Sequence, residues 1–90
     1  MKIHYNIRVW GRVQGVGYRF NCKREAKAMG ITGFVKNRPD GSVYIEAEGD
    51  ASNLEIFVSR CKKGPTYAHV DKVHINKSEP VGFSEFKISY

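Results

Sequence analysis

Apolar and polar side chains alternate along the first strand-like stretch of the chain, and this alternation ends at a glycine-rich segment. The odd positions carry Ile3, Tyr5, Ile7, Val9, Gly11 and Val13, and the even positions between them carry His4, Asn6, Arg8, Trp10 and Arg12. A period of two residues predicts a strand with one buried face. From Arg19 to Met29 the apolar residues instead recur at helical spacing, which predicts a helix. Gly30 follows as its expected C-terminal cap.

A hairpin and a second helix are expected in the middle of the chain. The segments 32–38 and 42–48 flank Pro39-Asp40-Gly41, in which proline and glycine favour a tight turn. Ser52 and Glu55 have the spacing of a capping box, so we expect Ser52 to cap the second helix. Gly64-Pro65 marks the end of that helix.

Two further strands complete the predicted order of elements. In the segment 70–76, Val70 is out of phase with Val73 and Ile75, which indicates a bulge. Alternation from Phe86 to Tyr90 predicts a short last strand. The order strand–helix–strand–strand–helix–strand predicts the α+β, ferredoxin-like split βαβ (βαββαβ) sandwich. We expect an antiparallel sheet with two helices on one face and a short extra C-terminal strand, within one domain spanning residues 1–90.

The charge balance indicates an anionic partner. The chain has 15 Lys and Arg against 9 Asp and Glu, a formal net charge of +6, which favours a phosphate compound, a nucleic acid or a membrane surface. The basic residues are scattered, so an arm that binds polyanions is not expected. No stretch resembles a signal peptide or a membrane span, and we expect a cytoplasmic protein.

The cysteines and histidines do not have the spacing of a metal site. Cys22 and Cys61 fit no CxxC motif, and both fall on the apolar stripes of the predicted helices. We therefore expect two buried thiols, with a disulfide as the less favoured alternative. His4, His69 and His74 are far apart in sequence, and we expect them at the surface or partly packed. No metal or cofactor is expected.

The segment 14–19 joins the first strand to the first helix and has the features of an anion site. Gly15 and Gly17 allow successive backbone N–H groups to point inward as a nest. The start of the helix adds free N–H groups, and the Arg19 guanidinium matches phosphate oxygens in pairs. The glycine spacing fits neither a P-loop nor a dinucleotide fingerprint. A glycine-rich turn with a solvated Arg19 explains these residues equally well.

Two long motifs resemble the signatures of the acylphosphatase family. Residues 11–19 read GRVQGVGYR, and residues 33–43 read GFVKNRPDGSV. Shorter similarities follow in order at Ala47-Glu48-Gly49, Gly64-Pro65 with Ala68 and Val70, and Phe86-Lys87-Ile88. Tyr18 stands where phenylalanine is frequent in the family, and Phe34 where tryptophan is frequent. Both departures keep an aromatic ring, and the resemblance implies the same ferredoxin-like fold.

The resemblance also implies an activity and a set of site residues. The backbone amides of Gln14, Gly15, Val16, Gly17, Tyr18 and Arg19 would hold the substrate phosphate. The Arg19 side chain would bind it too, and Asn37 would position the attacking water. The implied reaction hydrolyses an acyl phosphate to a carboxylate and inorganic phosphate without a metal, in a monomer that needs no nucleic acid or membrane. From the residues alone, Asn37 is more simply a turn residue before Pro39.

Two alternatives of other classes remain. RNA-recognition domains share the predicted topology and stack bases on aromatic side chains of the sheet, where this chain would have Trp10, Phe34 and Tyr44. Gly33-Phe34-Val35 resembles a fragment of the RNA-binding signature, although it lies in the second strand rather than the third. The other alternative is a phosphate-binding module of the same fold without catalysis. The enzyme is preferred because both family residues, Arg19 and Asn37, are present.

Overall fold

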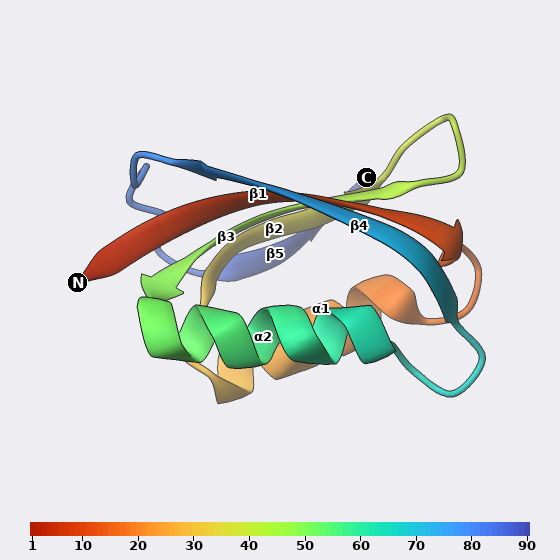
Figure 1. Ribbon diagram of the computed structural model, residues 1–90, viewed down its shortest axis with the longest axis horizontal. Helices are drawn as coiled ribbons and strands as arrows, with labels where there is room; N and C mark the ends of the chain where they lie inside the picture. The colour runs from red at the N-terminus through yellow and green to blue at the C-terminus, as the bar shows by residue number, and fades with distance from the viewer.

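A five-stranded sheet with two helices on one face makes up residues 1–90 of the computed structural model (Figure 1). The elements are β1 Lys2–Arg12, α1 Tyr18–Ala28, β2 Thr32–Asn37, β3 Val43–Asp50, α2 Ala51–Lys63, β4 His69–Ser78 and β5 Phe86–Ser89. The predicted order of elements and the ferredoxin-like fold are confirmed, with bounds that differ by one or two residues. Neither helix has the length and hydropathy needed to cross a membrane.

The strand order β4-β1-β3-β2-β5 places β1 and β3 in the middle of the sheet. The pairs among the first four strands are antiparallel, whereas β5 pairs with β2 in parallel, so the extra strand makes the sheet mixed. Val43 faces Val9 of β1 on one side and Asn37 of β2 on the other. This register brings the end of β2 to the same edge of the sheet as the loop that follows β1.

The expected bulge in β4 is confirmed by its pairing with β1. Trp10 pairs with Lys72, but Gly11 pairs with Val70, so Asp71 is the extra residue. The extra residue shifts the alternation by one position, so Val70 and Val73 point to the same face of the sheet although they are out of phase in the sequence.

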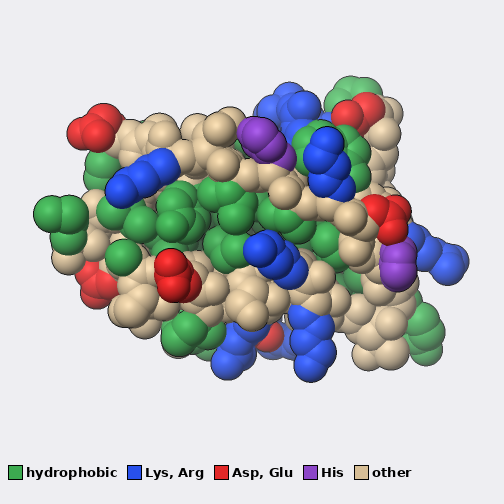
Figure 2. All heavy atoms as spheres, in the orientation of Figure 1, with side chains coloured by type: hydrophobic (Ala, Val, Ile, Leu, Met, Phe, Trp, Pro, Cys, Tyr) green, Lys and Arg blue, Asp and Glu red, His purple; other side chains and the backbone are tan.

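The core lies between the sheet and the helices, and the cysteines are part of it. Figure 2 shows hydrophobic side chains as a band along this side of the molecule, between the sheet above and α2 below. Cys22 and Cys61 are buried free thiols with their Sγ atoms 3.9 Å apart, as expected. The hydrogen bond with Cys22 and burial raise the pKa of the Cys61 thiol, which keeps it protonated.

The start of α2 differs from the prediction. The helix begins at Ala51, with Asp50 as the N-cap and no side-chain hydrogen bond to cap it, so Ser52 lies inside the first turn. The prediction of a capping box at Ser52 is therefore wrong. The reason is that β3 continues to Asp50, which pairs with Lys2, and the chain passes from strand to helix without a loop. The predicted end is confirmed, since Lys63 is the last helical residue and Gly64 follows with φ of 69°.

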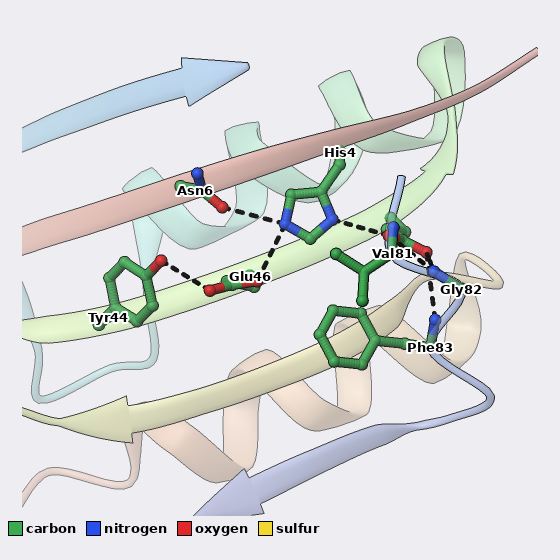
Figure 3. A network of polar contacts seen from close by, with 8 residues as sticks. His4, Asn6, Tyr44, Glu46, Val81, Gly82 and Phe83 are labelled. Atoms are coloured by element: carbon green, nitrogen blue, oxygen red, sulfur yellow. Dashed lines mark hydrogen bonds and ion pairs between the residues drawn. The ribbon is translucent and has the colours of Figure 1, made fainter. Parts of the chain in front are cut away.

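The expectation that His4 lies at the surface or is partly packed is wrong, because its side chain is only 1% exposed. It lies on the sheet face that the helices leave open, under the segment that connects β4 to β5 (Figure 3). The Phe83 ring stacks on it at 5.9 Å between centroids. His4 Nδ1 lies 2.8 Å from Glu48 Oε2, and Nε2 lies 3.0 Å from Asn6 Oδ1 and 3.1 Å from Glu46 Oε1. Local spacing does not reveal this burial, because residues more than 70 positions away cause it.

Glu48 binds the backbone of the segment that connects β4 to β5. Its side chain is buried, and its carboxylate accepts hydrogen bonds from the backbone N–H groups of Val81, Gly82 and Phe83. Figure 3 labels these three donors of the connecting segment. Burial by itself would raise the pKa of Glu48, but the hydrogen bonds from Val81, His4, Gly82 and Phe83 outweigh it. The pKa of Glu48 is therefore lowered below its ordinary value of 4.5.

We expect Glu48 to make the stability of the fold sensitive to acid. A carboxyl whose pKa is lower in the folded state stabilises the fold fully above the unfolded value of 4.5. This contribution is lost as the pH falls through the lower, folded value. Glu48→Gln should therefore unfold at lower urea concentration than the wild type at neutral pH. Its free energy of unfolding should also change less than that of the wild type as the pH falls into the acid range. Glu55→Gln, at an exposed position of α2, is the control and should match the wild type. Equal acid sensitivity of Glu48→Gln and the wild type would contradict this role.

Candidate active site

The loop between β1 and α1 has the glycine backbone angles expected of an anion-binding nest. Gly15 has φ of 72° and Gly17 has φ of 79°, both in the left-handed region that other residues rarely adopt. A Cβ atom added at either glycine would meet nothing within 4 Å, so backbone angle rather than space requires glycine there. Gly17 is the N-cap of α1, and no side chain caps the helix. The N–H groups of its first turn therefore keep their capacity to bind an anion.

Tyr18 fixes the start of α1 against the core. Its side chain is buried, and its hydroxyl donates a hydrogen bond of 2.8 Å to the carbonyl oxygen of Cys61 near the end of α2. Burial raises the pKa of Tyr18, so the phenol stays protonated and remains a donor. The first turn of α1, and with it the nest, is thereby tied to the second helix.

The Arg19 side chain is held by the C-terminal end of the chain. Its Nη1 atom donates to the carbonyl oxygen of Ser89 at 3.3 Å, and its Cζ atom lies 4.8 Å from the centroid of the Tyr90 ring. These partners are some 70 residues away in sequence. No local pattern in the sequence indicates these partners, because only the parallel pairing of β5 with β2 brings them to this edge of the sheet.

Asn37 and Arg19 line one cavity of about 290 Å³, together with Val13, Gly15, Gly17, Tyr18 and Phe20. The lining therefore has one positive charge and no carboxylate. Asn37 Oδ1 is buried and has no hydrogen-bond partner. The turn after β2 is closed by other groups, including Arg38 N–H to Ser42 O at 2.8 Å. The side-chain oxygen of Asn37 therefore does not bond to the turn, as the simple explanation of a turn residue would require.

Gln14 connects the nest to the hairpin that carries Asn37. Its Nε2 atom donates to the carbonyl oxygens of Arg38 and Ser42, both at 2.8 Å. From the sequence only the backbone amide of Gln14 was a candidate, and the side chain was missed. The one available signal is a long amide side chain directly before the glycines. The two bonds set the position of Asn37, the neighbour of Arg38, relative to the loop.

Loss of the Gln14 side-chain bonds should disturb both stability and catalysis. Gln14→Leu keeps the size but removes two hydrogen bonds, and the carbonyl oxygens of Arg38 and Ser42 keep only their backbone donors, the N–H groups of Gly41 and Arg38. The loss of two such bonds costs about 1–3 kcal/mol in free energy of unfolding. We expect urea denaturation to show this loss and kcat to fall more than phosphate affinity, because Asn37 moves relative to the nest. Gln14→Glu, which accepts but does not donate, should behave similarly at neutral pH. Unchanged stability and kcat in Gln14→Leu would contradict the role.

The sequence matches the Acylphosphatase family over residues 5–88. This chain belongs to the acylphosphatase family. It is 46% identical over 84 residues to the acylphosphatase of Thermotoga maritima, covering 93% of each chain. It is 44% identical over 88 residues to that of Archaeoglobus fulgidus, covering 98% of this chain and 99% of the other.

The fold of a solved acylphosphatase agrees over the whole chain. The crystal structure of the Bacillus subtilis acylphosphatase superimposes with a TM-score of 0.96 at 40% identity, covering 98% of this chain and 99% of that one. The acylphosphatase family and the hydrolase class implied by the two sequence motifs are thus confirmed. Nowhere in this acylphosphatase do three or more His, Cys, Asp or Glu side chains meet in a group able to hold a metal ion.

Proposed function

We propose that the cavity between the nest and Asn37 hydrolyses the carboxyl–phosphate bond of small acyl phosphates, with Arg19 and Asn37 as the catalytic residues. The observation that carries this proposal is the unpartnered, buried Asn37 Oδ1 in the cavity that Arg19 also lines. An acceptor without a partner is costly to bury and fits a site where a water molecule is held.

The first task of the site is to bind the phosphoryl group and to stabilise its charge. Gly15 and Gly17 have the left-handed backbone angles of an anion-binding nest, and the N-terminus of α1, which no side chain caps, adds its positive dipole end. The Arg19 guanidinium supplies a full charge and paired donors. Phosphoryl transfer needs chiefly positioning and charge stabilisation, and these groups provide both without reorganisation.

The second task is to place water in line with the bond that breaks. Asn37 Oδ1 accepts a hydrogen bond from the water, and its amide orients the water without titrating. The water oxygen forms a bond to phosphorus while the bond to the acyl oxygen breaks, and that electron pair leaves with the carboxylate. A phosphate oxygen of the substrate accepts the proton of the water. Because a carboxylate is a good leaving group, no acid is required to protonate it.

The reaction as proposed needs few partners. Residues 1–90 act as one domain and as a monomer in the cytoplasm, with an acyl phosphate as substrate and inorganic phosphate as product. No cofactor, nucleic acid or membrane takes part in the hydrolysis. The nest and Arg19 supply the positive field that a metal ion would otherwise provide.

A phosphate-release assay tests this function. Benzoyl phosphate and acetyl phosphate are compared with 4-nitrophenyl phosphate, an ordinary monoester, each with and without EDTA. We expect release from the acyl phosphates alone and no effect of the chelator. Equal release from the monoester would contradict the substrate class, and loss in EDTA would contradict the metal-free mechanism. Phosphate binding without release from any substrate would instead identify a silent binding module.

A further inference from the structure

The sheet face that carries no helix gathers aromatic and cationic side chains at one level of the sheet. Trp10 pairs with Lys72 and Arg8 with Tyr44, while Tyr44 also pairs with Lys36, so these side chains share a face across β4, β1, β3 and β2. Directly paired residues in a sheet point to the same side. We define the open-face patch as Arg8, Trp10, Lys36, Arg38, Tyr44 and Lys72.

A cation lies over each aromatic ring in the open-face patch. The Arg8 Cζ atom lies 5.8 Å and the Lys72 Nζ atom 5.1 Å from the centroid of the Trp10 ring. The Arg38 Cζ atom lies 4.5 Å from the centroid of the Tyr44 ring. Aromatic rings in contact with positive charge fit a ligand that has both planar groups and anionic groups.

A hollow of about 440 Å³ continues the open-face patch toward β5. It is lined by the rings of Phe34 and Phe83 and by Lys36 and Lys87, among other residues. The Phe34 ring lies 5.9 Å from the Tyr44 ring, so the hollow and the patch adjoin. The Phe83 ring meets Phe34 edge-on at 5.8 Å and forms the wall of the hollow.

The carboxylates on this face are already engaged. Glu46 accepts a hydrogen bond of 2.8 Å from the Tyr44 hydroxyl and lies 3.1 Å from His4 Nε2 (Figure 3). Glu85 pairs with Lys87 at 3.6 Å. The four cations of the open-face patch pair with no carboxylate within 4.0 Å, so its charge complements an extended anion.

We propose that the open-face patch and the adjoining hollow bind single-stranded nucleic acid. Bases stack on Trp10 and Tyr44 and enter the hollow at Phe34, and the phosphates between them contact the neighbouring cations. A duplex fits less well, because its bases are already stacked and only its phosphates are available. This differs from the expectation of no nucleic-acid partner, which came from the sequence alone.

The proposed surface is separate from the catalytic cavity. None of the residues that line the cavity belongs to the open-face patch. The helices cover the opposite face of the sheet, and the loop between β1 and α1 lies at its end (Figure 1). The binding therefore does not depend on hydrolysis, and either property is testable without the other.

The test measures fluorescence anisotropy of a labelled oligouridine of about twelve nucleotides, long enough for a site of this class. We expect binding that weakens as salt rises and that Trp10→Ala weakens by about tenfold, which corresponds to one lost base stack of about 1.4 kcal/mol. Trp10→Phe keeps a ring and should remain close to the wild type, which separates lost stacking from a folding defect. Thermal melting of each variant checks the fold directly.

A matched pair of lysines distinguishes the open-face patch from general basicity. Lys36→Gln should lower the slope of log affinity against log salt by about one. Lys27→Gln, at an exposed position in the last turn of α1, should not change it. The proposal fails if the oligonucleotide does not bind at low salt, if both lysine variants have the same effect, or if Trp10→Ala binds normally. It also fails if inorganic phosphate displaces the strand more strongly than chloride at the same ionic strength, or if a duplex of equal length binds as tightly.

Discussion

Arg19→Ala is expected to lower kcat/KM for an acyl phosphate by about 10³- to 10⁵-fold, the range measured for arginines that stabilise transferring phosphoryl groups. The guanidinium is the only charged group that lines the cavity, so alanine leaves the nest without its full positive charge. Inorganic phosphate, which presents the same oxygens, should also inhibit far more weakly. Steady-state kinetics with benzoyl phosphate, with phosphate as the inhibitor, measures both effects.

Two further variants make the Arg19 experiment specific. Arg19→Lys keeps the charge but loses the planar pair of donors, and we expect it to recover only part of the activity. Arg24→Ala changes an exposed arginine of the same helix, whose Nη2 donates to Asn21 Oδ1 at 2.8 Å away from the catalytic cavity. Activity of Arg19→Ala within tenfold of Arg24→Ala would overturn the assignment of Arg19.

Asn37→Ala is expected to lower kcat by about 10²- to 10³-fold while phosphate still inhibits as in the wild type. The physical reason is that, in the proposed mechanism, Asn37 positions the water whereas the nest and Arg19 bind the phosphate, so the two functions separate. Removal of Asn37 also removes a buried oxygen that has no partner, and the fold should not lose stability. Kinetics, phosphate inhibition and urea denaturation of the same variant test these three statements.

Asn76→Ala is the control for the Asn37 experiment, since Asn76 lies exposed on β4 and outside the cavity. It should leave kcat unchanged. If Asn37→Ala lost phosphate inhibition to the same extent as turnover, Asn37 would hold the loop in shape rather than orient water. Asn37→Asp adds a further check, because a carboxylate beside the phosphoryl group should repel it and raise KM.

The secondary structure was predictable because its causes are local. Alternation in β1, helical spacing in α1 and the Gly64 stop depend on neighbouring residues, and the structure agrees with each. The capping box at Ser52 was wrong because pairing of Asp50 with Lys2, far away in sequence, extends β3 into the helix start. The pairing of β3 with β1 thus decided where the helix begins, against the local preference for a capping box at Ser52.

The candidate site was predictable in its residues but not in its geometry. Arg19 and Asn37 came from two motifs that resemble one family, and the nest from the two glycines. The bonds from Gln14 to the hairpin span 24 and 28 residues, and the contact from Arg19 to Ser89 spans 70. No local pattern contains such pairs, so neither contact could be predicted from the sequence.

By itself, the sequence determined the order of the elements, the glycine loop that can hold an anion, and the family. These follow from backbone angles, side-chain period and long matching motifs, all of which act along the chain. Only the tertiary structure decided that Asn37 Oδ1 is left without a partner in a cavity that Arg19 also lines, that His4 is buried, and that cations lie over the rings of the open face. These properties arise where distant strands pair and where the segment after β4 crosses the sheet, so they exist only once the chain has folded.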